Sequence, residues 1–61
     1  MTLLELLRGR AADYETLAEW HAERAAAGAP RHGAAADACV AIAIVLREVA
    51  QAVEDGRLEV A

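Results

Sequence analysis

The sequence has almost none of the residues that stabilise very small domains through covalent or metal cross-links. Cys39 is its only cysteine, so no disulfide can form within the chain, and one Cys with two His cannot supply the paired ligands of a zinc finger. A chain of 61 residues lies near the lower size limit for independent folding, where disulfides, a metal or oligomerisation usually complete the fold. We therefore expect oligomerisation, with no metal and no cofactor.

Lysine and phenylalanine are absent, and all six basic side chains are arginines. The net charge of −4 argues against duplex nucleic acid as a partner, because phosphate binding needs a surplus of basic residues. The longest apolar run, 38–46, is far shorter than the roughly 20 residues that span a bilayer, so no membrane is expected. No basic leader precedes the first leucines, which predicts no signal peptide, and a lone free cysteine is typical of the cytoplasm.

Alanine is abundant, at 17 of the 61 residues, and it is the best helix former. Thr2 and Glu5 have the spacing of a capping box, which predicts the start of a helix. Apolar positions then recur every three or four residues in one seam that keeps its phase across Gly9, so we predict one helix over about 2–27. The seam consists of Leu4, Leu7, Ala11, Tyr14, Ala18, His21 and Ala25.

The middle of the chain contains the one clear interruption of helical sequence. Gly28 suits a left-handed helix cap and Pro30 cannot continue a helix, which predicts a turn over 28–33. A second helix is predicted over about 34–55, with Gly56 as its terminating residue.

Two helices joined by a short turn predict an all-α fold, a single-domain antiparallel helical hairpin. Residue i of the first helix then lies beside about residue 61 − i of the second, which places Tyr14 near Arg47. A short tail over 56–61 follows, and its Leu58 and Val60 are expected to fold back onto the hairpin. This outline is similar to the Rop class of dimeric four-helix bundles, in architecture alone and with no shared motif.

The second helix has more apolar surface than one neighbouring helix can cover. At about 100° per residue, two adjacent seams occupy more than half of its circumference. One seam can pack on the first helix, and the other predicts a homodimeric four-helix bundle or a higher oligomer. The seams are Ala38, Ile42, Val45, Val49 and Ala52, and Cys39, Leu46, Ala50 and Val53. The expected oligomer core is Leu4, Leu7, Tyr14, Leu17, Ile42, Val45, Leu46 and Val49.

No catalytic motif is present, so we expect a non-enzymatic protein-interaction module, such as an adaptor, an inhibitor or a regulatory subunit. Trp20 and Arg24 are predicted to bind a partner, because Trp and Arg are the commonest interface hot spots. Val40 and Ile44 are added to this set, since they fall outside both seams. His21 lies on the apolar seam without a catalytic or metal-binding companion, which favours a structural role.

An alternative function is the binding of a small anionic or nucleotide-like ligand at an oligomer interface, for example by a signal-sequestering protein. Arginine forks bind phosphate oxygens in pairs, and a tyrosine ring can flank a base. The candidate residues, expected to converge at the open end of the hairpin, are Arg8, Arg10, Tyr14 and Arg47. The competing interpretation is that the arginines form ordinary surface ion pairs, with Glu5, Glu48, Glu54 and Asp55.

Overall fold

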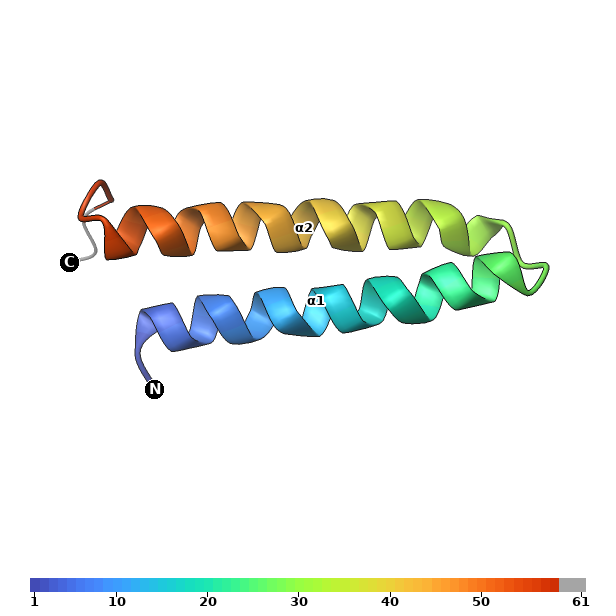
Figure 1. Ribbon diagram of the computed structural model, residues 1–61, viewed down its shortest axis with the longest axis horizontal. Coiled ribbons are helices and arrows are strands. Elements are labelled where there is room, and N and C mark those ends of the chain that lie inside the picture. Colours follow the sequence, from blue (N-terminus) through green and yellow to red (C-terminus); the bar gives the residue numbers. More distant parts are fainter. Residues whose placement is uncertain (59–61) are drawn as a thin grey trace.

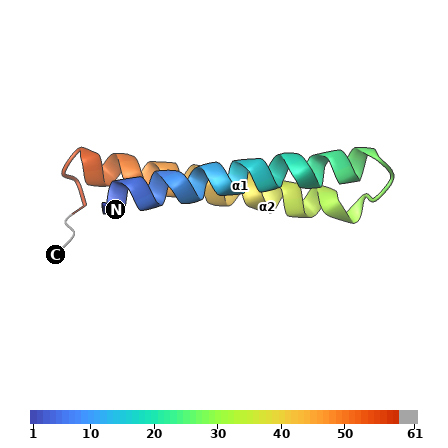
Figure 2. The same ribbon diagram turned by 90° about the horizontal axis from the view of Figure 1, so that it is seen from below.

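The computed structural model describes residues 1–58 and consists of two antiparallel helices joined by a tight turn (Figure 1). Helix α1 spans Leu3–Ala26 and helix α2 spans Arg31–Glu54, each with 24 residues. The helices lie side by side in both views, in a rod of 45 × 19 × 14 Å (Figure 2). Within residues 1–58 there is no strand, and the predicted all-α helical hairpin is confirmed.

The start of α1 has the predicted capping box. The Thr2 hydroxyl accepts from the amide of Glu5 at 3.1 Å, and the Glu5 carboxylate accepts from the amide of Thr2 at 3.1 Å. The helix then continues through Gly9 without a break. A glycine inside a helix costs about 1 kcal/mol relative to alanine. The apolar seam that packs α1 along its length on α2 offsets this cost.

A glycine of positive φ follows each helix, Gly28 at 104° and Gly56 at 74°. After Gly28, the amide of Ala29 donates to the Arg24 carbonyl at 3.1 Å, and the equivalent bond after Gly56 is 2.9 Å long. These bonds satisfy carbonyl groups that the end of a helix otherwise leaves unpaired, in the pattern of a Schellman cap. Both glycines therefore end the helices as the sequence predicted.

The turn is shorter than the predicted range 28–33, because α2 already begins at Arg31. Pro30 is the N-cap, with φ −59° and ψ −25°, and the amide of Gly33 donates to its carbonyl at 3.0 Å. Proline has a φ suited to the first turn of a helix, and the N–H that it lacks would have no partner there. Pro30 thus starts α2 as well as preventing the continuation of α1.

The buried centre of the contact between the helices is made of small side chains. The six buried apolar residues are Ala11, Ala18, Ala36, Cys39, Ala43 and Ala50. The predicted seam of α1 faces α2, with its larger members only half-buried. Of the two predicted seams of α2, the one with Cys39 and Ala50 faces α1, and Ala36 and Ala43 add to it. Cys39 is a buried free thiol.

Two ion pairs between the helices define their register. Arg8 pairs with Glu54, and Arg47 pairs with Glu15, so residue i lies beside residue 62 − i. The predicted pairing with 61 − i is therefore correct to within one residue. The tail was expected to fold back onto the hairpin at Leu58; its amide donates to the Ala52 carbonyl at 3.3 Å, and its side chain is 46% exposed. Val60, for which the same was predicted, lies outside the described residues.

Candidate interaction surfaces

Most of the large apolar side chains of the described residues are exposed on the outside of the hairpin, and the others are only half-buried. None of them is fully buried. Burial of a Val, Leu or Ile side chain stabilises a fold by roughly 1.5–3 kcal/mol, whereas one methyl group contributes about 0.8 kcal/mol. Most of the hydrophobic driving force of this sequence is thus unused within one hairpin. The exposed set is Met1, Leu3, Leu6, Leu17, Trp20, Val40, Ile42, Ile44, Val45 and Leu58.

One side of the hairpin carries what we call the aliphatic face, defined as Leu17, Ile42, Val45, Leu46 and Val49. Val45 is 56% exposed, and Leu46 and Val49 are half-buried. Ile42, Val45 and Leu46 line a shallow depression of about 270 Å³. All five residues belong to the predicted oligomer core.

The remaining members of the predicted oligomer core lie at the contact between the helices. Leu4, Leu7 and Tyr14 occupy the α1 seam, and all three are half-buried. They are therefore shared between packing on α2 and exposure to solvent, so a second hairpin can still cover part of their surface.

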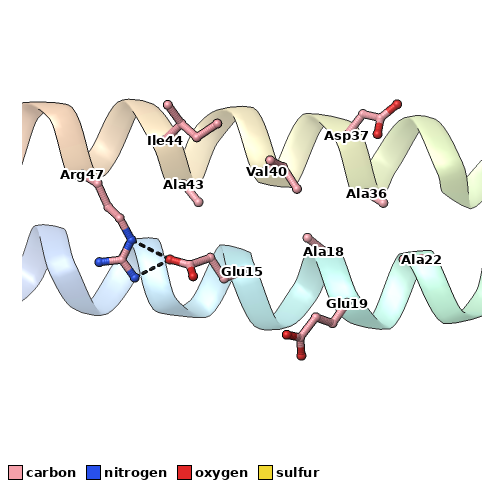
Figure 3. Close-up of a pocket in the computed structure, with 10 residues that line it drawn as sticks. All are labelled: Glu15, Ala18, Glu19, Ala22, Ala36, Asp37, Val40, Ala43, Ile44 and Arg47. Carbon is pink, nitrogen blue, oxygen red and sulfur yellow. Dashed lines mark hydrogen bonds and ion pairs between the residues drawn. The ribbon is translucent and has the colours of Figure 1, made fainter.

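The opposite side of the hairpin carries a groove of about 590 Å³ between the two helices, which we call the acidic groove (Figure 3). Its apolar residues are Ala18, Ala22, Ala36, Val40, Ala43 and Ile44. Its charged residues are Glu15, Glu19, Asp37 and Arg47. Glu19 projects from α1 and Asp37 from α2, on opposite edges of the groove (Figure 3).

Helical geometry places the aliphatic face and the acidic groove on opposite sides. Two residues along a helix rotate the side chain by about 200°. Leu17 follows Glu15 by two residues, and Ile42 precedes Ile44 by two. Because Glu15 and Ile44 line the groove, Leu17 and Ile42 point away from it.

The acidic groove has a negative charge that nearby arginines do not cancel. The Arg47 guanidinium is already paired with Glu15, to which its Nε donates at 2.6 Å. Glu19 and Asp37 make no ion pair within residues 1–58. Two exposed carboxylates therefore flank an apolar floor.

Within one hairpin, the four residues predicted to bind an anionic ligand do not border a single depression. Arg8 and Arg47 border the same small depression of about 140 Å³, but each guanidinium is paired with a carboxylate of the hairpin. Arg10 lines a different depression, beside Asp13. Tyr14 borders neither of them. Arg8 and Arg47 thus form surface ion pairs, as the competing interpretation predicted. The partner of Arg8, Glu54, was among the predicted partners, whereas the partner of Arg47, Glu15, was not.

Trp20 and Arg24 lie together near the turn, away from Val40 and Ile44. The Arg24 guanidinium lies 4.5 Å from the centre of the Trp20 ring. The ring makes edge contacts with His21 and His32, at centroid distances of 4.9 and 5.6 Å. Neither Trp20 nor Arg24 lines the acidic groove, so the predicted partner-binding residues divide into two separate places.

The two histidines join α1 to α2 beside the turn. Nδ1 of His21 and Nδ1 of His32 are 2.8 Å apart, so one ring donates a proton and the other, neutral, ring accepts it. Burial in the cluster lowers the pKa of His32, and the positive charges of His21, Arg31 and Arg24 lower it further. This contact was not predicted from the sequence. The only available signal was the presence of a histidine near each end of the turn.

Within residues 1–58, no group of three or more His, Cys, Asp or Glu side chains is placed to hold a metal ion. Neither helix has a stretch that is both long and apolar enough to cross a membrane. No protein-family profile, no curated protein and no solved structure matches the chain.

Proposed function

We propose that this chain is a non-enzymatic helical interaction module that acts as a homo-oligomer, assembled through the aliphatic face. The observation that supports this proposal is the distribution of side-chain size. Alanines and one cysteine fill the contact between the helices, while Ile42 and Val45 lie exposed. Two hairpins that place their aliphatic faces together form a four-helix bundle with an ordinary core of Leu, Ile and Val.

The aliphatic face also suits a contact between identical copies. Its five defining residues carry no charge, so a two-fold contact centred on them places no like charges together at its centre. Contiguous exposed apolar surface of this kind marks interaction sites in soluble proteins. The uncharged face thus supports self-association more strongly than the acidic groove does.

Adjacent residues offer a matched test of this assignment. Ile44 and Val45 are 52% and 56% exposed, but Ile44 lines the acidic groove and Val45 the aliphatic face. We expect the native protein to have at least twice the chain mass of 6.4 kDa in light scattering. Val45→Asp should then give a monomer or an unfolded chain, and Ile44→Asp should keep the oligomer. A folded monomeric native protein, or equal effects of both substitutions, contradicts the proposal.

The arrangement of the arginines favours a small anionic ligand less than self-association. Arg8 and Arg47 would each have to leave a carboxylate partner before they could bind a phosphate, and Arg10 borders another depression. Calorimetric titration with nucleotides tests that alternative directly. If a nucleotide releases heat on binding, and Arg10→Ala or Arg47→Ala abolishes that heat, ligand binding would be favoured over the interaction module.

A further inference from the structure

The acidic groove combines an apolar floor with charged edges, on the side of the hairpin that self-association leaves free. Small Ala18 and Ala43 side chains form its bottom between the helices (Figure 3). Val40 and Ile44 border it and are both exposed. Small residues at such a position let another helix approach closely, at an axial distance of about 8–10 Å.

We propose that the acidic groove binds one amphipathic helix of a partner protein, with an apolar stripe flanked by arginine or lysine side chains. The groove follows α2 from Ala36 to Arg47, which corresponds to about 16 Å or roughly three helical turns. A segment of that length presents apolar anchors at positions i, i+3 or i+4, and i+7, the usual pattern of a helix bound in a groove.

The charges at the edges select a basic helix over a second copy of this chain. Glu19 and Asp37 flank the floor from opposite helices, and neither makes an ion pair within residues 1–58. A two-fold contact of groove with groove would bring these carboxylates from both copies into one interface, where like charges repel. A basic helix instead meets opposite charges along both edges, and the net charge of −4 attracts it from a distance.

The test uses the full chain and two synthetic peptides of roughly 14 residues, the length of about four helical turns. Both carry the same stripe of leucine and alanine, and their polar positions are arginine in one peptide and glutamate in the other. By fluorescence anisotropy we expect the arginine peptide to bind with a micromolar Kd that weakens as salt rises, since the edge charges are exposed. The glutamate peptide should not bind.

Matched variants separate the edge charges from net charge. Glu19→Arg with Asp37→Arg should weaken binding of the arginine peptide at least tenfold. Asp13→Arg with Glu48→Arg makes the same change in net charge at residues that do not line the groove, and should weaken binding by less than threefold. Val40→Ser with Ile44→Ser should also weaken binding at least tenfold by removing the apolar border.

Three binding results would overturn this inference: no binding of the arginine peptide, equal binding of both peptides, or equal effects of the two charge-reversal pairs. The native mass of the Val40→Ser, Ile44→Ser variant distinguishes a further case. If that variant dissociates the oligomer, a second copy occupies the groove and the basic helix does not. Peptide binding to the acidic groove does not require the aliphatic face. A failure of the peptide experiment would therefore leave self-association intact, and that proposal is tested separately by the native mass of Val45→Asp.

Discussion

The side of α2 that faces α1 and the side that forms the aliphatic face are both apolar, yet their side chains differ in size. The covered side presents Ala36, Ala43 and Ala50, and the uncovered side presents Ile42 and Val45. Small residues let the two helices of one hairpin lie close together. Larger residues remain on the outside, where only another molecule can bury them. Apolar character alone therefore does not identify the core of a single chain; side-chain size decides which stripe is internal.

A charge on the aliphatic face should have the largest effect on this arrangement. We expect Leu46→Asp to unfold the protein or dissociate it, because an unpaired charge buried in the assembled bundle costs several kcal/mol. Circular dichroism melting together with native mass measures both outcomes. Ile44→Asp, on the groove side of the same helix, is the control and should melt close to the native protein. Similar melting of both variants would remove the distinction between the two sides.

Enlarging the inner contact should have the next largest effect. Ala43 is only 4% exposed, so Ala43→Leu forces the helices apart, and overpacking of this kind typically costs about 1–3 kcal/mol. Ala34 is exposed on the same helix, and Ala34→Leu is the control for helix propensity and added apolar surface. Chemical denaturation measures both variants. If Ala43→Leu is as stable as the native protein, the contact is not closely packed.

A pH titration should reveal a smaller effect at the turn end. The folded pKa of His32 is lowered, so the unfolded chain takes up its proton at higher pH than the folded chain does. The stability that the neutral ring contributes is therefore complete above about pH 6.5, the unfolded value, and declines as the pH falls below it. We expect the melting temperature to fall between neutral and mildly acidic pH.

The His32→Gln variant provides the control for this pH effect, since it removes the titrating ring. It should lose most of the pH dependence, and Trp20, the only tryptophan, reports the same change by its fluorescence because its ring contacts His32. An unchanged pH profile in His32→Gln would show that other groups are responsible.

The ion pairs should contribute least. Arg47 and Glu15 both have about half of their side-chain surface exposed, and such pairs contribute roughly 0–1 kcal/mol. Arg47→Ala should therefore lower stability by no more than about 1 kcal/mol, with the loss reduced at high salt. Denaturation at low and high salt measures it. A loss as large as that from Leu46→Asp would mean that the register, rather than the aliphatic face, dominates stability.

Much of the fold was predictable because its signals are local. The Thr2 capping box, the continuous seam across Gly9, and the caps at Gly28 and Gly56 each depend on a few neighbouring residues, and the structure has all of them. Pro30 was interpreted only as a helix breaker, and its second property, a φ suited to the first turn, moved the start of α2 to Arg31. The start of α2 was predicted three residues too late because a proline can both end one helix and begin the next.

The surfaces were less predictable because they depend on the relative rotation of two helices. Both seams of α2 are apolar, so the pattern alone could not say which one faces α1. The small size of Ala36 and Ala43, which belonged to neither seam, was the available signal. Arg47 pairs with Glu15 on the other helix, and the contact of His21 with His32 crosses the turn. Neither pairing follows from spacing within one helix.

The most direct test of the account measures how thermal unfolding depends on protein concentration. If the aliphatic face completes the core in an oligomer, folding and assembly are linked, and the melting temperature rises with protomer concentration. We predict a clear increase over roughly a hundredfold range of concentration, with a loss of helical circular dichroism signal at the lowest concentrations. A melting temperature that stays constant over that range, with full helicity and the mass of a single chain, would contradict the account.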